Sequence, residues 1–437
     1  MAITEPDHDY VMRTVRERGV RFVRLWFVDV AGLLKSFAIP VSELEEGLEE
    51  GVGIDGSSLE GGARRSERDA IAYPDPRSFQ VLPWRPESLV ARMFCDVRLP
   101  GGEPFPTDPR YALRRALERA AELGFTFQVG PEIEFFLFAA TDEGSPRPLD
   151  EGAYFDLTTL DVSSDFRRRT LEHLEQMSIP VKASHHEVAP SQHEIDLAHT
   201  DALSMADAIT TFRLAVREVA RELGVFASFM PKPLQDQAGS GMHLHLSLFR
   251  DGRNAFYDGS EGGESLSDTG RRFLAGVLAH AGELTAVTNG WVNSYKRLCS
   301  GFEAPRTVSW TRAGDGGLVR VPSNRPGKEA AARIELRSPD PACNSYLALT
   351  LVLAAGLRGL EQELEPPPET TNGAVDALPR LPRDLREATD LLASSELARE
   401  AFGGELRDLY VRSRQAEWEA HQAQVTEFER ERLLRAL

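Results

Sequence analysis

Three short segments of the sequence place groups that bind cations, phosphates or carboxylates on one side of an expected strand. Successive side chains of a strand point to opposite faces, so every second residue lies on the same face. The polar sets are Glu132 and Glu134 in residues 132–138, His243, His245 and Ser247 in residues 242–248, and Arg333, Glu335 and Arg337 in residues 333–337. Taken singly, each segment is better explained as a half-buried strand with a solvated polar face. Together they indicate one shared site.

A fourth segment, residues 185–194, adds two carboxylates, Glu187 and Glu194, on either side of Pro190. Carboxylate oxygens with a minority of imidazole nitrogens and no thiolates suit Mg²⁺ or Mn²⁺ rather than zinc or copper. The number of these groups is enough for two ions. Such cations clamp nucleotide phosphates and neutralise charge in phosphoryl transfer. Since the sequence has no Walker A motif, arginines and metals are expected to handle the phosphates.

The bulk composition limits the class of protein and its partners. The 437 residues, 41% of them hydrophobic and 27% charged, predict a globular chain of two domains or one large domain. A net charge of -18 argues against nucleic acid and acidic membrane surfaces as partners. The start lacks the pattern of a signal peptide, and the apolar run at 346–357 is shorter than the roughly 20 residues of a membrane span. We therefore expect a cytoplasmic protein with no membrane partner.

The elements that must position these side chains fall into two expected domains. The first hundred residues have the pattern of a small α+β unit. Proline and glycine crowd residues 99–109, where Asp108 and Pro109 form a favourable helix start. Beyond it, helical patterns alternate with strand-like segments and cover residues 165–177, 202–223, 267–287, 342–364 and 413–435. We predict an N-terminal domain over residues 1–104 and a catalytic domain over residues 105–437.

The polar segments belong to an ordered set of eight motifs. These are Asp55-Gly56-Ser57-Ser58, Gly130-Pro131-Glu132-Ile133-Glu134, His185-His186-Glu187-Val188, Met230-Pro231-Lys232-Pro233, Gly239-Ser240-Gly241-Met242-His243, Asn293-Ser294-Tyr295-Lys296-Arg297, Gly301-Phe302-Glu303-Ala304-Pro305 and Arg333-Ile334-Glu335-Leu336-Arg337. In this order they resemble the motifs of bacterial type I glutamine synthetase over nearly the whole chain. The resemblance implies an α+β fold, with a small β-grasp-like N-terminal domain and a larger catalytic domain built on a curved antiparallel sheet flanked by helices.

The resemblance also implies roles for individual residues. The ligands of a first metal, near glutamate and the amine, would be Glu134, Glu187 and Glu194, and those of a second, near the ATP phosphates, would be Glu132, His243 and Glu335. Glutamate would be held by Glu134, Gly239, Arg297 and Arg337, the nucleotide by His245, Ser247, Arg320 and Arg333, and the amine by Asp55, Ser58, Tyr154 and Glu187. The groups matching catalytic residues of the family are Asp55, Glu303, Arg320 and Arg337.

The implied reaction explains why such groups are needed. A carboxylate resists attack by amines, so ATP first converts the γ-carboxylate of glutamate to γ-glutamyl phosphate, with metals and arginines stabilising the charge. Ammonium is no nucleophile until a carboxylate such as Asp55 or Glu303 takes its proton. The acyl phosphate must also be kept from water, which suits a flap around Gly301. In the family the Asp55 loop completes the site of a neighbouring subunit, which implies a ring-shaped homo-oligomer, expected to be a dodecamer.

Two positions depart from the family pattern and leave alternatives open. Asp315 stands where an arginine near the phosphates is usual, which would suit a non-catalytic relative unless Arg312 takes its place. Gly62 stands where phenylalanine or tryptophan is usual, which would leave space for an amine larger than ammonia, such as a polyamine or ethanolamine. Because the other groups of the ammonium pocket are present, we predict ammonia as the amine, ahead of these two alternatives.

Overall fold

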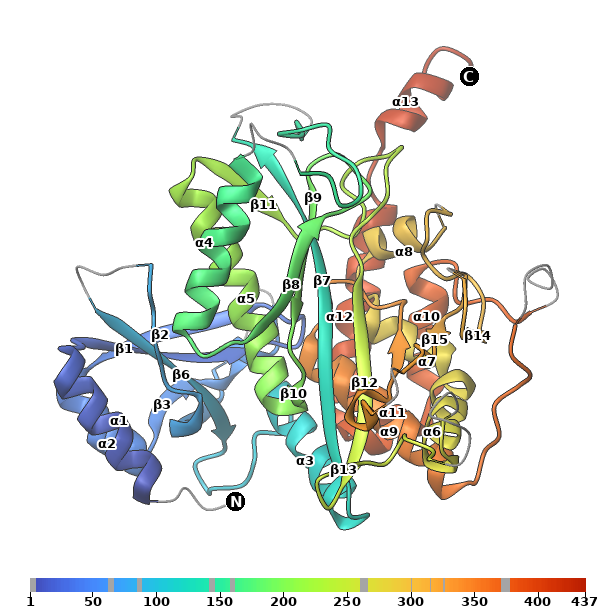
Figure 1. Ribbon diagram of the computed structural model, residues 1–437. Coiled ribbons are helices and arrows are strands. Elements are labelled where there is room, and N and C mark those ends of the chain that lie inside the picture. Colours follow the sequence, from blue (N-terminus) through green and yellow to red (C-terminus); the bar gives the residue numbers. More distant parts are fainter. Residues whose placement is uncertain are drawn as a thin grey trace.

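The chain folds around two β-sheets that follow one another in the sequence, as a computed structural model shows (Figure 1). The structure describes residues 5–61, 67–84, 89–140, 146–157, 162–259, 266–299, 301–314, 316–324, 327–370 and 378–437. In Figure 1 the N-terminal sheet lies at the left, the larger sheet runs through the centre, and most C-terminal helices lie at the right. The expected α+β class is therefore confirmed.

The smaller sheet has the strand order β2-β1-β6-β4-β3, with β5 paired to β6. The strands are β1 (Phe22–Val28), β2 (Leu34–Pro40), β3 (Val52–Asp55), β4 (Asp69–Pro74), β5 (Gln80–Val81) and β6 (Val90–Arg98). Only β1 and β6 pair in parallel among them. Helices α1 (Glu5–Arg18) and α2 (Leu44–Glu49) contribute Val11, Val15 and Leu44 to a core of this sheet's own. Since β3 is the edge strand, Asp55 at its end lies at the margin of the domain.

The larger sheet has the order β14-β15-β16-β12-β7-β9-β8, with β10 and β11 on β7 and β13 on β12. Its strands are β7 (Thr126–Ala139), β8 (Val181–His186), β9 (Gln192–Leu197), β10 (Thr200–Asp201), β11 (Val225–Ser228), β12 (Met242–Arg250), β13 (Arg253–Asn254), β14 (Trp310–Thr311), β15 (Val319–Arg320) and β16 (Ile334–Leu336). All of these pairings except β14 with β15 are antiparallel. The long strand β7 lies between β9, which carries Glu194, and β12, which carries His243 and His245. Glu335 lies on β16, the next strand beyond β12.

Helices follow the large sheet along the whole second domain. They are α3 (Pro109–Glu122), α4 (Val162–Gln176), α5 (Ala202–Glu222), α6 (Asp268–Ala279), α7 (Ala281–Thr288), α8 (Val292–Cys299), α9 (Ser345–Glu361), α10 (Leu385–Ser394), α11 (Glu396–Phe402), α12 (Gly404–Gln422) and α13 (Glu427–Leu433), with the 3₁₀ helix η5 (Glu329–Ala331). The short 3₁₀ helices η1 (Val41–Glu43), η2 (Gly56–Leu59) and η3 (Pro76–Ser78) lie between the strands of the smaller sheet. Asp108 caps α3 through the backbone N–H of Arg110, as its sequence position predicts.

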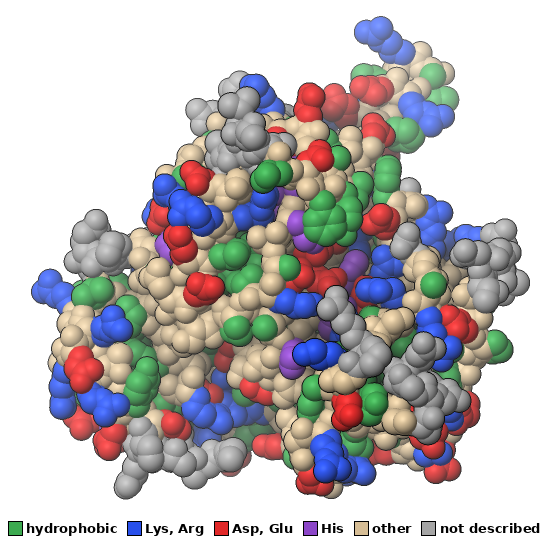
Figure 2. Space-filling model, viewed as in Figure 1, with side chains coloured by type: hydrophobic (Ala, Val, Ile, Leu, Met, Phe, Trp, Pro, Cys, Tyr) green, Lys and Arg blue, Asp and Glu red, His purple; other side chains and the backbone are tan. Residues whose placement is uncertain are grey.

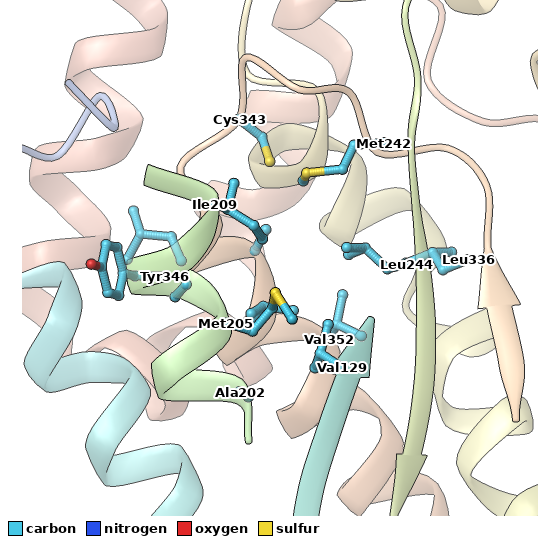
Figure 3. Close-up of a cluster of buried hydrophobic side chains, with 14 of the residues drawn as sticks. Val129, Ala202, Met205, Ile209, Met242, Leu244, Leu336, Cys343, Tyr346 and Val352 are labelled. Atoms are coloured by element: carbon cyan, nitrogen blue, oxygen red, sulfur yellow. The ribbon is translucent and has the colours of Figure 1, made fainter. Parts of the chain in front are cut away.

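The apolar face of the sheet is buried against helices, which leaves its other face for polar groups. Figure 3 shows Met205 and Ile209 of α5 near Val129 of β7 and Leu244 of β12, with Val352 of α9 beside them. Buried methyl and methylene groups of this kind contribute roughly 0.8 kcal/mol per CH₂. Because side chains alternate along β7, burying this face directs the carboxylates of the same strand to the opposite side.

Two expected helices are each divided in the structure. The pattern over residues 267–287 is one element in sequence but is divided between α6 and α7 at His280, whose backbone leaves helical geometry. The pattern over residues 413–435 is divided between α12 and α13, because Thr426 and Glu429 form a reciprocal capping box that begins a new helix. Hydrophobic periodicity alone did not reveal either break.

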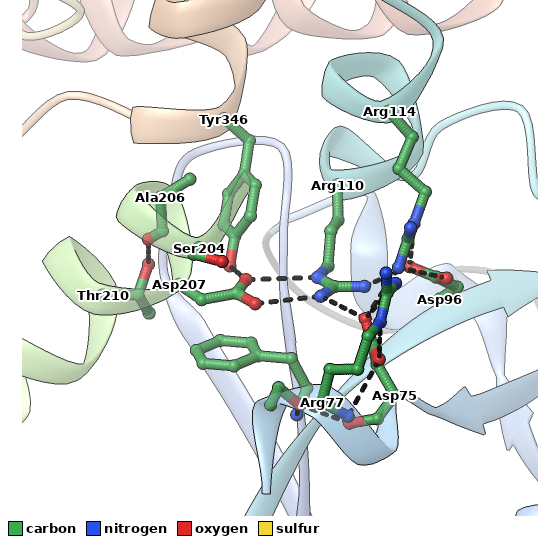
Figure 4. Close-up of polar contacts among 12 residues, drawn as sticks. Asp75, Arg77, Asp96, Arg110, Arg114, Ser204, Ala206, Asp207, Thr210 and Tyr346 are labelled. Atoms are coloured by element: carbon green, nitrogen blue, oxygen red, sulfur yellow. Dashed lines mark hydrogen bonds and ion pairs between the residues drawn. The ribbon is translucent and has the colours of Figure 1, made fainter. Parts of the chain in front are cut away.

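An ion-pair network joins the N-terminal sheet to the helices of the second domain (Figure 4). The guanidinium of Arg110 donates to both carboxylate oxygens of Asp207 at 3.1 and 2.9 Å and to Asp75 at 2.9 Å, and it pairs with Asp96. Burial raises the pKa of Asp75, but Arg110 and Arg77 outweigh this effect and lower it overall. Arg110 therefore compensates three carboxylates from three different elements.

Replacing Arg110 by methionine is expected to destabilise the chain by about 3–5 kcal/mol, because it leaves buried carboxylates without their cation. The measurement is the urea midpoint at fixed protein concentration. Arg119→Met is the matched control: it lies on the same helix, and its partners Glu122 and Glu361 are exposed. It should leave the midpoint nearly unchanged. Equal midpoints for the two variants would show that the network does not hold the domains together.

The C-terminal helix α13 extends away from the rest of the molecule (Figure 1). The helix and the residues directly before and after it carry exposed apolar side chains, among them Val425, Phe428, Leu433 and Leu434. Exposed apolar groups gathered on one projecting element are typical of a surface that another protein covers. None of the described helices combines the length and the apolar character that a membrane crossing requires.

Candidate active site

Strand register brings the polar segments together on one face of the large sheet. Glu132 lies opposite His243 of β12 on one side and opposite Asp196 of β9 on the other. Glu134 lies opposite Glu194. Directly opposed residues have their Cβ atoms about 4.5–5.5 Å apart, so their side chains reach one another. Figure 2 shows acidic, basic and histidine side chains gathered in a hollow near the centre of this face.

The first group consists of Glu132, His243 and Glu335. Each offers a ligand atom within 4.8 Å of the others, and Nδ1 of His243 lies 3.6 Å from Glu132 and 3.5 Å from Glu335. Arg320 pairs with the opposite oxygen of Glu335 at 2.5 Å, and Arg337 lies 3.4 Å from its first oxygen. Two guanidinium groups therefore lie against the carboxylate of Glu335.

The second group consists of Glu134, Glu187 and Glu194, all buried. Burial and then the charge of Glu134 raise the pKa of Glu187 to about 8. Burial and the charges of Glu134, Glu132 and Glu187 raise the pKa of Glu194 well above its ordinary range. His185 lies between two of them, 3.5 Å from Glu187 and 3.1 Å from Glu194. Carboxylates crowded in this way repel one another unless protons or cations lie between them.

Both groups fit divalent cations of the Mg²⁺ or Mn²⁺ type. Their donors are carboxylate oxygens with one imidazole nitrogen, and none is a thiolate. The raised pKa values of Glu187 and Glu194 reflect uncompensated negative charge that a bound cation would neutralise. Of the six residues expected from the sequence, Glu132, His243 and Glu335 lie close enough to share one ion. Glu134 lies opposite Glu194, and the three-ligand group that contains Glu194 is completed by His185 and Asp196.

Metal binding at the second group is expected to strengthen with pH. In the unfolded chain Glu187 loses its proton near its ordinary pKa of 4.5, whereas in the folded, metal-free chain its pKa is raised to about 8. Between these two pH values only the folded chain keeps the proton. Its stability therefore falls as pH rises through that window, whereas a metal binds the deprotonated form. The rise in thermal midpoint on adding Mn²⁺ to EDTA-treated protein should be larger near pH 8 than near pH 6. Glu187→Gln should weaken this pH dependence; an unchanged slope would contradict the ligand assignment.

One arginine, Arg297, and two glycines, Gly239 and Gly241, lie beside Glu134 of the second group. Arg297 is buried and donates to the carbonyl oxygens of Ser338 and Arg337 at 2.8 and 3.2 Å. A Cβ on Gly241 would lie 2.5 Å from its guanidinium and 3.1 Å from Glu134. A Cβ on Gly239 would lie 2.2 Å from a carbonyl oxygen. Only glycine therefore lets the backbone approach Arg297 and Glu134 this closely.

A cavity of about 600 Å³ opens beside the first group. Glu132, His245, Ser247 and Arg333 line it, together with Asp196. Nε2 of His245 donates to Glu132 at 2.6 Å, because its Nδ1 already accepts from Nε of Arg333 at 3.0 Å. Pockets for nucleotide-sized ligands have volumes of roughly 300–1,000 Å³. Three of the four residues expected for the nucleotide, His245, Ser247 and Arg333, thus line a cavity of suitable size. The fourth, Arg320, pairs with Glu335 and is not among the lining residues.

The residues expected for the amine are divided between two places. Tyr154 lies by the second group: burial and then the charges of Glu187, Glu194 and Glu303 raise its pKa. Asp55 accepts from the backbone N–H groups of Ser57 and Arg68, and Ser58 donates to the carbonyl of Asp55. In Figure 1 β3, which ends at Asp55, lies in the N-terminal sheet and apart from β7 and β9. Within one chain, the described contacts of Asp55 are thus local to its own domain.

Two residues of the segment expected to form a flap adopt positive φ angles. Gly301 has φ of 87° and Glu303 has φ of 32°, a region that non-glycine residues rarely adopt. Phe302 packs under the ammonium of Lys232, whose Nζ lies 4.6 Å from the ring centroid. Such positions concentrate at functional loops. Gly62 and Asp315, on which the alternative amines and the non-catalytic reading rest, lie outside the described residues.

Sequence reasoning missed several polar residues of the same face. Asp196 is buried, lines the cavity and lies within 4.8 Å of His185 and Glu194. Gln192 donates to Glu134 at 2.7 Å. Both follow from the alternation along β9 that also carries Glu194, so extending the pattern by two residues in each direction would have found them.

Two family models match the chain. "Glutamine synthetase, beta-Grasp domain" covers residues 19–100, and "Glutamine synthetase, catalytic domain" covers residues 106–433. The β-grasp character expected for the N-terminal domain is thereby confirmed.

Curated relatives match over almost their whole length. "Glutamine synthetase" of Mycolicibacterium smegmatis is 50% identical over 96% of this chain and 97% of the relative. "Glutamine synthetase" of Methanosarcina mazei is 45% identical over 98% and 97%. Among solved structures, one described as "GmaS/ADP complex-Conformation 1" matches with a TM-score of 0.88 at 32% identity, over 97% of this chain and 99% of that chain.

Proposed function

The chain belongs to the glutamine synthetase family of ATP-dependent ligases, and we propose that it joins the γ-carboxylate of glutamate to ammonia through a γ-glutamyl phosphate intermediate. ATP would be split to ADP and phosphate. One observation carries this proposal: two adjacent acidic groups share one face of the sheet, one beside a nucleotide-sized cavity and the other beside Arg297 and Tyr154.

The activation step assigns a task to each cationic side chain. Arg297, with Gly239 and Glu134 next to it, would bind the amino acid; Arg320 and Arg337 would stabilise charge on the phosphoryl group as it moves to the carboxylate. His245, Ser247 and Arg333 would hold the nucleotide. Divalent cations on the two acidic groups would supply further neutralisation of phosphate charge. The pairing of Arg320 and Arg337 with Glu335 already holds these guanidinium groups in place.

The amide-forming step needs a bound cation and a base. Tyr154 and Glu187 would receive the ammonium ion, and Asp55 or Glu303 would take its proton before attack on the acyl phosphate. Since Asp55 and Ser58 lie in the N-terminal domain, this step fits an oligomer in which a neighbouring subunit supplies them. The exposed apolar side chains of α13 supply a surface for such assembly. We propose a ring-shaped homo-oligomer, a dodecamer by the family's pattern, that acts in the cytoplasm, where ATP is present.

A second candidate is a ligase for a larger amine. The rings of Tyr154 and Phe155, 54% and 63% exposed, lie beside the acidic group and offer an apolar surface to an alkyl chain. The position of Gly62 in the sequence also favours this reading.

Phosphate release from ATP, measured with glutamate and Mg²⁺ and with ammonium, ethanolamine, putrescine or spermidine in parallel, separates the candidates. We expect release with ammonium at the highest kcat/KM. Release with polyamines alone would replace ammonia by the larger amine, and release with none of them would favour the non-catalytic relative.

A further inference from the structure

We infer that Phe155 is a specificity-determining residue of the amine site, and that Asp150 is the positioning residue that holds Phe155 and Tyr154 against it. The inference rests on the proposed function and deepens it. It names a protonated amine, bound by aromatic faces as well as by carboxylates, as the ligand of this segment.

Asp150 anchors the segment to the turn between β8 and β9. Its Oδ1 accepts from Nε2 of His186 at 2.9 Å and from the backbone N–H groups of Gly152 and Ser191 at 3.0 Å each. Its Oδ2 accepts from the hydroxyl of Ser163 at 3.1 Å. A single carboxylate thus ties residues before Tyr154 to the turn that lies between Glu187 and Glu194. A Cβ on Gly152 would lie 2.6 Å from His186, so the close docking also requires glycine.

A tight turn then sets the backbone of Phe155. Asp156 accepts from the N–H of Ala153 and donates its own N–H to the carbonyl of Ala153, both at 2.9 Å. The N–H of Phe155 donates to the carbonyl of His186 at 3.1 Å. Phe155 adopts φ of 62°, which a bulky side chain rarely does. Strain of this kind persists only where the surroundings enforce it, and it concentrates at ligand sites.

The enforced geometry brings both rings to His185. The ring centroids of Phe155 and Tyr154 lie 4.6 and 5.5 Å from that of His185, and 4.3 Å from each other. His185 itself lies between Glu187 and Glu194. Aromatic faces next to an anionic group form an environment that favours ammonium and alkylammonium ions. Phe155 is more exposed than Tyr154. Its ring therefore forms the outer wall of the amine site, and its bulk limits the size of the amine.

A metal ion at Asp150, His186 and His193 is the competing explanation, since the ligand atoms of these residues lie within 4.8 Å of one another. The hydrogen bonds argue against it. Nδ1 of His186 donates to the carbonyl of Glu187 at 2.7 Å while its Nε2 donates to Asp150. Nδ1 of His193 accepts from Arg167 at 2.9 Å, so the proton of its neutral ring sits on Nε2, the nitrogen that faces Asp150. Neither imidazole offers a lone pair to a cation there.

Steady-state kinetics of two variants test the inference. Asp150→Ala should raise the KM for ammonium about tenfold while the KM values for glutamate and ATP change less than about twofold, and Asp150→Asn, which keeps an accepting oxygen, should recover most of the loss. Phe155→Ala should raise kcat/KM for ethylammonium relative to ammonium about tenfold, because it opens space for the chain. Leu157→Ala, 82% exposed in the same segment, is the control and should change neither ratio.

Hydrogen exchange gives a readout that does not depend on turnover. In Asp150→Ala the amides of Gly152, Phe155 and Ser191 should exchange faster, with those of β7 unchanged. Where the wild type is active, two results would overturn the inference. One is an equal change in the KM values for ammonium, glutamate and ATP in Asp150→Ala. The other is an unchanged ratio of kcat/KM for ethylammonium to that for ammonium in Phe155→Ala. If the wild type turns over no amine, the proposed function fails and the amine role of Phe155 fails with it; unchanged exchange would then also refute the anchor.

Discussion

Replacing Glu335 by glutamine is expected to lower kcat by about 10²–10³-fold, the cost of removing one preorganised charge from a phosphoryl-transfer site. Glu335 is 2% exposed, lies 3.5 Å from Nδ1 of His243 and accepts from Arg320, so the change removes a ligand and releases the arginine at once. Glutamine keeps the shape of the side chain. The measurement is phosphate release at saturating glutamate and ammonium, with Mn²⁺ affinity followed by calorimetry on the same protein.

Glu329→Gln is the matched control for this variant, because Glu329 lies just upstream on an exposed 3₁₀ helix. It should retain wild-type activity and metal binding. Full activity in Glu335→Gln, with an unchanged thermal midpoint, would remove Glu335 from the metal site.

Replacing Asp55 by asparagine is expected to lower amide formation by about 10²–10⁴-fold, the range for loss of a general base. Asparagine can still accept from the N–H of Ser57 and so preserves the local turn, whereas it cannot take a proton from ammonium. ATP binding, followed by fluorescence of a nucleotide analogue, should be unchanged. Asp69→Asn, exposed and directly opposite Asp55 on β4, should remain active.

Co-expression of Asp55→Asn with Glu335→Gln tests whether neighbouring subunits share the site. In a shared site each active centre takes Asp55 from one subunit and Glu335 from the next, so random mixing leaves about a quarter of the centres intact. Activity should return to about a quarter of wild type. If one chain builds its whole site, no mixture recovers activity.

The local part of the site could be predicted from the sequence, because alternation along a strand is a local property. It placed Glu132 with Glu134 and His243 with His245, and the structure has each pair on one face of its strand. The pairing of strands that are distant in the sequence could not be predicted in this way. The register that sets Glu134 opposite Glu194, 60 residues away, depends on the packing of the whole sheet. Only the resemblance to a known family supplied it.

Contacts between domains were also beyond the sequence pattern. Arg110 lies in a helix whose periodicity was clear, yet nothing local shows that its guanidinium pairs with Asp75 and Asp207. The same holds for Asp150, because its partners His186 and Ser191 are far along the chain. Buried polar networks are set by tertiary packing, and each member has an ordinary neighbourhood in sequence.

Transfer of oxygen between glutamate and phosphate tests the central claim most directly. Glutamate carrying ¹⁸O in its γ-carboxylate is incubated with ATP, Mg²⁺, ammonium and the enzyme, and the released phosphate is analysed by mass spectrometry. If ATP activates the γ-carboxylate at the paired acidic groups, one ¹⁸O atom appears in each phosphate formed, in step with the amide. Phosphate that contains no ¹⁸O while amide accumulates would contradict the acyl phosphate and, with it, the proposed use of this site.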